Sequence, residues 1–108
     1  ELAGFSTSNL SAQPNKWKKE GQIFAIRHQG LDYFPAYGLD AEAGYRPLKP
    51  LAPVLALFGD AKDGWGLAYW FASANSFLGG KRPQDVLLKS PDRVLAAAAD
   101  EMAEVAHG

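Results

Sequence analysis

The segment from Asn75 to Pro83 holds the residue types best suited to direct contact with another molecule. Gly79 and Gly80 lack side chains, so the backbone of a partner can come close there. Arg82 carries a planar guanidinium with five donors, which suits carboxylate or carbonyl groups on a partner. In the alternative, the glycines only shape a corner and Arg82 caps a helix of its own chain. The residues of this candidate binding surface are Asn75, Leu78, Gly80, Lys81, Arg82 and Pro83.

The Gly79-Gly80-Lys81 sequence within this segment also raises the question of phosphate binding. Phosphate-binding loops place glycines, a lysine and a hydroxyl residue at fixed spacing directly after a strand. That spacing is missing here, and the preceding residues have no strand pattern. We therefore expect neither a nucleotide nor another cofactor at this turn.

A second group of basic residues suggests contact with nucleic acid. A short helix followed by a hairpin with basic tips can place several cations along a phosphate backbone. Glu20 and Asp32 lie among these cations and dilute the charge, so a solvated protein face is the alternative. The candidate DNA-binding residues are Lys16, Lys18, Lys19, Arg27 and His28.

The sequence offers no set of residues for catalysis or metal binding. It has no Cys, which removes thiolate nucleophiles, disulfides and cysteine metal sites. Its two histidines, His28 and His107, lie far apart in the sequence, so we expect neither a metal site nor a histidine general base. Asp100 and Glu101 fit the solvated face of a helix. We therefore predict a protein without enzymatic activity.

The first 40 residues predict a unit that resembles the remnant of a helix-turn-helix, followed by a β-hairpin, and residues 41–108 predict a helical domain. Over residues 1–21 we expect a helix remnant, a turn rich in Ser, Thr and Asn, and a short second helix. The second helix should begin near Pro14 and end at Gly21.

The predicted hairpin has a turn at Gln29-Gly30. Residues 22–28 and 31–37 on either side are rich in strand formers. Pro35 predicts either an edge strand or a break in the strand, because proline cannot donate a ladder hydrogen bond. We expect a polar loop over residues 40–49.

Residues 50–105 predict a bundle of about four helices. The stretch 65–74 is apolar on nearly every side, which is typical of a buried central helix, so we expect Trp65 and Trp70 in the core. Asp63 is the expected N-cap of this helix. The predicted apolar faces of the flanking helices contain Leu51, Val54, Leu55 and Phe58, and then Val94, Leu95, Ala98, Met102 and Val105.

Two proline-containing segments predict the starts of the last two helices. Pro83 can occupy the first turn of a short helix. Ser90-Pro91-Asp92 supplies a cap, a first helical residue and a charge that complements the helix dipole. The last helix should run to about Val105.

Composition narrows the classes of protein further. Hydrophobic residues make up 47% of the chain, which argues against general disorder, and the net charge of −1 argues against a strongly basic nucleic-acid binder. No apolar run is long enough for a membrane span, so we expect no membrane partner and a cytoplasmic location. Because the chain opens on Glu1 without an initiator Met, we expect N-terminal sequence to be missing.

Several specific sequence pieces follow one another along the chain. Residues 65–71 read Trp-Gly-Leu-Ala-Tyr-Trp-Phe, and residues 78–87 read Leu-Gly-Gly-Lys-Arg-Pro-Gln-Asp-Val-Leu. With these pieces, residues 50–100 resemble the C-terminal, toxin-binding domain of the MbcA/ParS/Xre antitoxin family. The series at 78–87 is the most specific part of this resemblance.

The resemblance implies a partner, a RES-domain toxin that consumes or transfers from NAD, and an antitoxin that covers the active site of this toxin. The segment Asn75–Pro83 would then bind the toxin, and the N-terminal region would repress the operon by binding operator DNA. We also expect a homo-oligomer. The alternative is a DNA-binding transcriptional regulator whose C-terminal bundle serves dimerisation only. The expected fold class is mainly α (α+β).

Overall fold

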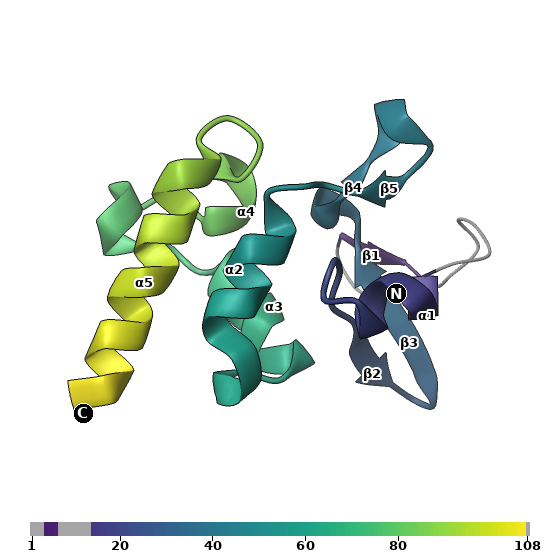
Figure 1. Cartoon of the computed structure of the whole chain (residues 1–108), viewed down its shortest axis with the longest axis horizontal. Helices are drawn as coiled ribbons and strands as arrows, with labels where there is room; N and C mark the ends of the chain where they lie inside the picture. Colours follow the sequence, from purple (N-terminus) through teal and green to yellow (C-terminus); the bar gives the residue numbers. More distant parts are fainter. Residues whose placement is uncertain (1–3, 7–13, 108) are drawn as a thin grey trace.

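Residues 4–6 and 14–107 are the part of the chain that this computed structural model describes. The fold is 57% helical with short strands near its N-terminus, which confirms the predicted mainly α (α+β) class. The strands and the first helix lie at one end of the molecule, and the C-terminal helix lies at the other (Figure 1).

The N-terminal helix α1 (Pro14–Lys19) begins at the predicted proline. It ends where Gly21 adopts a φ of 75°, and the Gly21 amide donates to the carbonyl of Lys18. The prediction of a helix remnant before α1 is wrong for the described residues 4–6. Phe5–Ser6 form strand β1 instead of a helix remnant, because they pair with a distant strand; residues 1–3 and 7–13 lie outside the described part.

The predicted hairpin consists of β2 (Ile26–His28) and β3 (Leu31–Pro35), which are antiparallel. Its two-residue turn has positive φ at both Gln29 (52°) and Gly30 (82°), as a tight turn between twisted strands requires. β3 also pairs with β1 and is therefore the central strand, so Pro35 does not mark an edge. Instead Pro35 ends the strand, and the 3-10 helix η1 (Ala36–Gly38) follows.

The segment predicted as a polar loop contains a second, very small hairpin. Strands β4 (Leu39–Asp40) and β5 (Arg46–Pro47) pair with each other, and the 3-10 helix η2 (Ala41–Ala43) lies between them. The Asp40 carboxylate accepts a hydrogen bond from the Glu42 amide at 3.0 Å and starts this turn. Two-residue strands leave no alternating pattern in the sequence, which is why the prediction missed them.

Four helices follow, as predicted. They are α2 (Leu51–Phe58), α3 (Gly64–Ala72), α4 (Pro83–Val86) and α5 (Pro91–His107), with 3-10 helices η3 (Gly59–Ala61) and η4 (Ser76–Leu78) in their connections. The predicted N-cap of α3 is confirmed, since the Asp63 carboxylate accepts from the Gly66 amide at 2.8 Å.

Helix α3 corrects the prediction of a helix buried on every side. Leu67, Trp70 and Phe71 are buried, but Trp65 is 48% exposed and Tyr69 is 77% exposed. The nine residues of α3 contact β2 and α4, and these two elements leave one face of the helix uncovered. Among the two tryptophans predicted for the core, only Trp70 is buried there.

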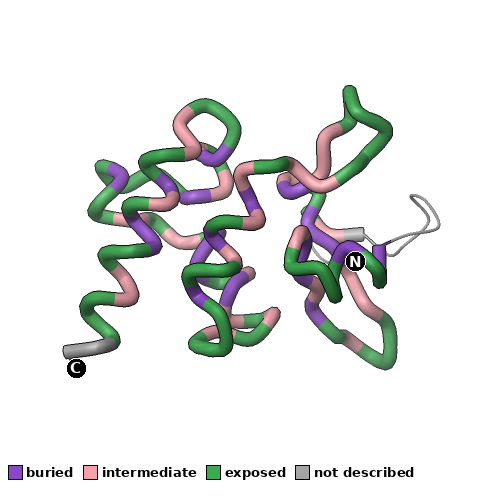
Figure 2. The backbone as a smooth tube through the Cα atoms, in the orientation of Figure 1, coloured by how far each residue is buried: buried purple, intermediate pink, exposed green. Residues whose placement is uncertain are grey.

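One hydrophobic cluster joins the N-terminal segment to the helices, and Figure 2 shows its buried residues running through both. Phe71 of α3 lies at the junction. Its ring stacks on Phe24 with centroids 5.9 Å apart and approaches the ring of Tyr37 at 5.4 Å. Other buried members include Trp17, Ile23, Ile26, Phe34, Leu51, Val54, Phe58, Leu78, Leu87 and Val94.

Candidate functional site

The candidate binding segment forms a loop that is closed by its own hydrogen bonds. Asn75 caps η4, since its side-chain oxygen accepts from the Phe77 amide at 2.9 Å. The Asn75 backbone accepts from Gly80 at 2.8 Å and donates to Lys81 at 3.0 Å. Gly79 and Gly80 have φ values of 68° and 88°, so glycine is required to return the chain. We call residues 75–81 the closed loop.

The six predicted binding residues divide into two groups. Leu78 and Pro83 are buried, so their side chains position the segment and present no surface to a partner. Asn75 is half-buried and shapes the closed loop. Gly80, Lys81 and Arg82 are exposed.

Arg82 is engaged within its own chain. Its Nε donates to Asp85 Oδ2 at 2.7 Å and its Nη2 donates to Asp85 Oδ1 at 3.1 Å. These hydrogen bonds, together with the charge of Asp85, raise the pKa of Arg82 above its ordinary value. Arg82 is the N-cap residue of α4 and Asp85 lies in the first turn of that helix, but the Arg82 side chain bonds Asp85 and makes no capping hydrogen bond to the helix backbone.

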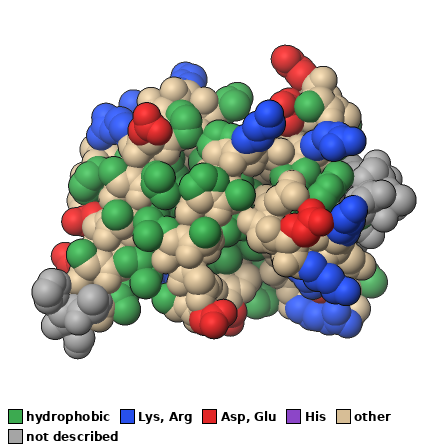
Figure 3. Space-filling view, in the orientation of Figure 1, with side chains coloured by type: hydrophobic (Ala, Val, Ile, Leu, Met, Phe, Trp, Pro, Cys, Tyr) green, Lys and Arg blue, Asp and Glu red, His purple; other side chains and the backbone are tan. Residues whose placement is uncertain are grey.

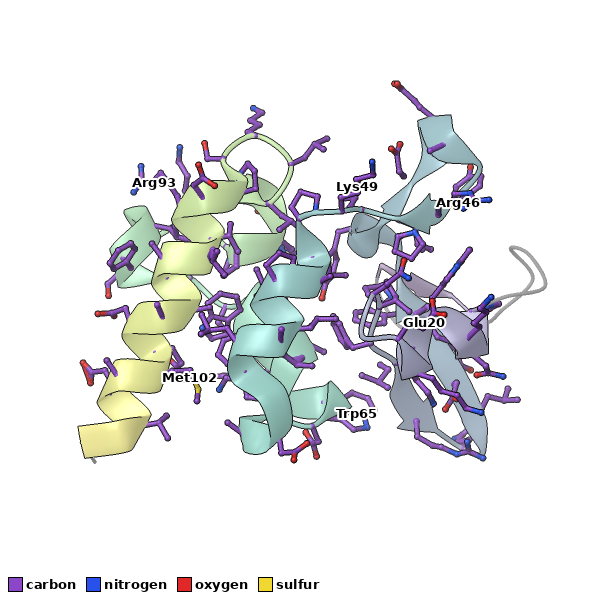
Figure 4. All side chains as sticks on the ribbon, viewed as in Figure 1. Glu20, Arg46, Lys49, Trp65, Arg93 and Met102 are labelled. Carbon is purple, nitrogen blue, oxygen red and sulfur yellow. The ribbon has the colours of Figure 1, made fainter. Side chains whose placement is uncertain are left out.

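Beside the closed loop lies a hollow of about 460 Å³, which we call the basic groove. Four cationic side chains line it and a single carboxylate opposes them. Figure 3 shows Lys and Arg side chains near the start of α5 and over α1 and the first hairpin, and Lys49 and Arg46, labelled in Figure 4, lie between these two groups. The basic groove is lined by Leu78, Gly80, Lys81, Arg82, Asp85, Val86, Lys89, Ser90 and Arg93.

Sequence reasoning missed Lys89 and Arg93 as members of a binding surface. Both flank the Ser90-Pro91 helix start, which drew attention only as a capping signal. Their spacing of four residues, close to the basic Lys81-Arg82 pair, was the available signal. Arg93 reaches back to the closed loop, where its Nη2 donates to the Phe77 carbonyl at 3.2 Å.

The predicted DNA-binding residues do not form a uniform basic surface. Asp32 accepts from Lys18 at 3.1 Å and from Arg27 at 3.3 Å, so one carboxylate offsets two of the cations. Lys16 and Lys19 are exposed on α1 and form no ion pair with any described residue.

His28, the fifth predicted DNA-binding residue, lies in a contact between the hairpin and α3. Its ring is edge-on to Tyr33 at 6.1 Å and to Trp65 at 6.2 Å. Trp65 Nε1 also donates to the Arg27 carbonyl at 3.1 Å, and Figure 4 shows Trp65 on the side of α3 that faces the hairpin. His28 therefore helps to hold α3 against β2.

The sequence predicts that Asp100 and Glu101 both lie on the solvated face of α5, and this prediction is wrong for Glu101. Glu101 accepts from Lys62 at 3.1 Å and so ties α5 to the connection between η3 and α3, whereas Asp100 is exposed. Over residues 4–6 and 14–107, three or more potential metal ligands nowhere come together. No helix in the same part of the chain is long and apolar enough to cross a membrane.

Comparison of the chain with models of protein families, with curated proteins and with solved structures finds no match. The case for a function therefore rests on the closed loop and the basic groove.

Proposed function

We propose that this chain is an antitoxin-like protein that binds and neutralises a RES-domain toxin in the cytoplasm. The resemblance of residues 78–87 to the toxin-binding domain of the MbcA/ParS/Xre family names the partner. The observation that carries the proposal is the closed loop, residues 75–81, which overlaps the start of this series. Hydrogen bonds hold the closed loop in one conformation. A surface ordered before binding loses less conformational entropy when a partner docks.

The exposed side chains around the closed loop suit a protein partner. The Phe77 side chain is 43% exposed, and the Phe77 backbone is held in place because its amide and its carbonyl both form hydrogen bonds. Aromatic and arginine side chains are enriched at protein interfaces, where a few of them supply most of the binding energy. Phe77 would supply the apolar contact, with Lys81 beside it as a charged contact.

A DNA-binding regulator remains the second candidate, and the structure gives it less support. Asp32 offsets the charges of Lys18 and Arg27, which leaves Lys16 and Lys19 as the cations of that group without an ion pair in the described part of the chain. Non-specific DNA affinity grows with the number of phosphates neutralised, so two lysines give weak binding.

Co-expression with a RES-domain toxin, taken from a neighbouring gene if one is encoded there, tests the proposal. We expect the two proteins to purify as a complex, and the chain to restore growth that the toxin alone arrests. Phe77→Asp should weaken the complex by about 30-fold or more, as removal of an interface anchor does. Tyr45→Asp is the matched control, because Tyr45 is an aromatic residue with a similar exposure of 47% away from the loop.

If the wild-type chain neither binds the toxin nor restores growth, the antitoxin function is wrong. If Phe77→Asp and Tyr45→Asp bind the toxin equally well, the closed loop is not the binding surface.

A further inference from the structure

The basic groove concentrates positive charge on a protein whose formal net charge is −1. Lys81, Arg82, Lys89 and Arg93 line it, and Asp85 is its single carboxylate. A hollow lined by charges of one sign attracts ligands of the opposite sign more strongly than a flat surface does. The groove is therefore suited to an anionic ligand.

Most of these cations have donors to spare. Lys81 and Lys89 are exposed and form no ion pair with any residue of the described part of the chain. Arg93 is exposed and uses Nη2 on the Phe77 carbonyl, which fixes the guanidinium at the edge of the groove (Figure 4). Among the four cations, only Arg82 pairs with a carboxylate of the described part of the chain, that of Asp85. The two parallel hydrogen bonds of this pair show how the groove can bind a carboxylate of a ligand.

We propose that the basic groove is a docking site for an acidic segment of a partner protein, with Asp85 occupying part of the site in the free chain. That the toxin supplies this segment rests on the proposed function above. Val86 in the lining, and the exposed Phe77 beside it, provide apolar contacts next to the charges, which suit a peptide. Such apolar contacts distinguish a peptide from a nucleic-acid backbone, which proteins bind mainly through its phosphates.

A labelled peptide of alternating glutamate and leucine residues tests the site directly by fluorescence anisotropy with the whole chain. Lys81→Glu combined with Lys89→Glu should weaken binding by about tenfold or more, since both charges become repulsive. Neither lysine supports another described residue through an ion pair, so the variant should remain folded, which circular dichroism checks. Lys16→Glu combined with Lys19→Glu changes the net charge equally and should leave binding within about twofold.

A second variant should improve binding. Asp85→Asn removes the charge of the internal competitor and leaves it one acceptor oxygen in place of two, which weakens its bond to Arg82, so we expect several-fold tighter peptide binding. Asp92→Asn is the control, because Asp92 is an exposed acidic residue at the start of α5 that does not line the groove. Tighter binding by Asp85→Asn alone supports the proposal.

Three results would overturn it. In the first, the two double variants, at Lys81 with Lys89 and at Lys16 with Lys19, weaken peptide binding equally, which would show that binding depends only on the net charge of the protein. In the second, Asp85→Asn binds no more tightly than Asp92→Asn. In the third, a duplex DNA oligonucleotide binds the groove more tightly than the peptide and is lost in the Lys81/Lys89 variant. If the chain binds the peptide but does not bind the toxin, the docking site stands and only the toxin as its partner is wrong.

Discussion

The hydroxyl of Tyr37 is buried with no hydrogen-bond partner among the residues that the structure describes. Its ring packs against Phe5 and Phe71, so the apolar part of the side chain is well used while the hydroxyl stays unsatisfied. We predict that Tyr37→Phe leaves the free energy of unfolding unchanged or raises it by about 1 kcal/mol, because an unpaired buried polar group is costly. Urea denaturation measures this, and a loss above about 2 kcal/mol would show that the hydroxyl is paired.

The same residue predicts a dependence on alkaline pH. Burial raises the pKa of Tyr37 above its ordinary value of 10.0, so the folded protein keeps the hydroxyl protonated where the unfolded chain ionises. Stability from this group is complete below pH 10 and is lost as pH rises above it. Between pH 9 and 11, as a rough window around the ordinary tyrosine pKa, Tyr37→Phe should therefore lose less stability than the wild type does. Parallel curves would contradict this assignment.

At the scale of elements, the start of α3 depends on the absence of a side chain. A Cβ at Gly64 would overlap the carbonyl oxygen of Ala25, just before β2, so the helix can approach the strand only with glycine there. We predict that Gly64→Ala lowers the free energy of unfolding by about 1–3 kcal/mol, despite the better helix propensity of alanine. Thermal denaturation followed by circular dichroism measures this.

Gly66→Ala in the same helix is the comparison for Gly64→Ala. A Cβ at Gly66 would meet only side-chain atoms of Asp63 and Lys62, which can move. We expect a change smaller than about 1 kcal/mol, since alanine gains in helix propensity what the small displacement costs. Equal losses in the two variants would mean that contact with Ala25 does not limit this junction.

At the scale of the whole molecule, the shared cluster predicts a single unfolding transition. Phe71 is fully buried between Phe24 of the N-terminal segment and Trp70 of its own helix. Phe71→Ala should lower the free energy of unfolding by about 3–5 kcal/mol, and the whole chain should still unfold together. Tryptophan fluorescence and far-ultraviolet circular dichroism should then give coincident curves.

Leu88→Ala is the control for this prediction, because Leu88 is 71% exposed and should contribute little to stability. Its effect should stay within about 0.5 kcal/mol. Two separate transitions in the Phe71→Ala variant would contradict a single cooperative unit and would divide the chain into independently stable parts.

The sequence determined the elements whose signals are local. Pro14, Pro83 and Pro91 each begin a helix where the sequence predicts a first-turn proline. The N-cap predicted at Asp63 is also confirmed. These signals work because the proline ring and the capping carboxylate act on the backbone within a few residues. The mainly α fold class follows from the same local information and from helical periodicity.

Tertiary structure alone decided the contacts between residues far apart in the sequence. It paired Phe5–Ser6 with β3, left Trp65 and Tyr69 partly open on α3, and brought Lys89 and Arg93 to the same hollow as Lys81. The type of a side chain and the periodicity around it indicate which contacts a residue can form. Whether that side chain is exposed depends on which other elements cover its face of the helix or strand. The candidate surface could therefore be predicted as a segment, whereas the basic groove became visible only when α4 and the start of α5 were placed beside the closed loop.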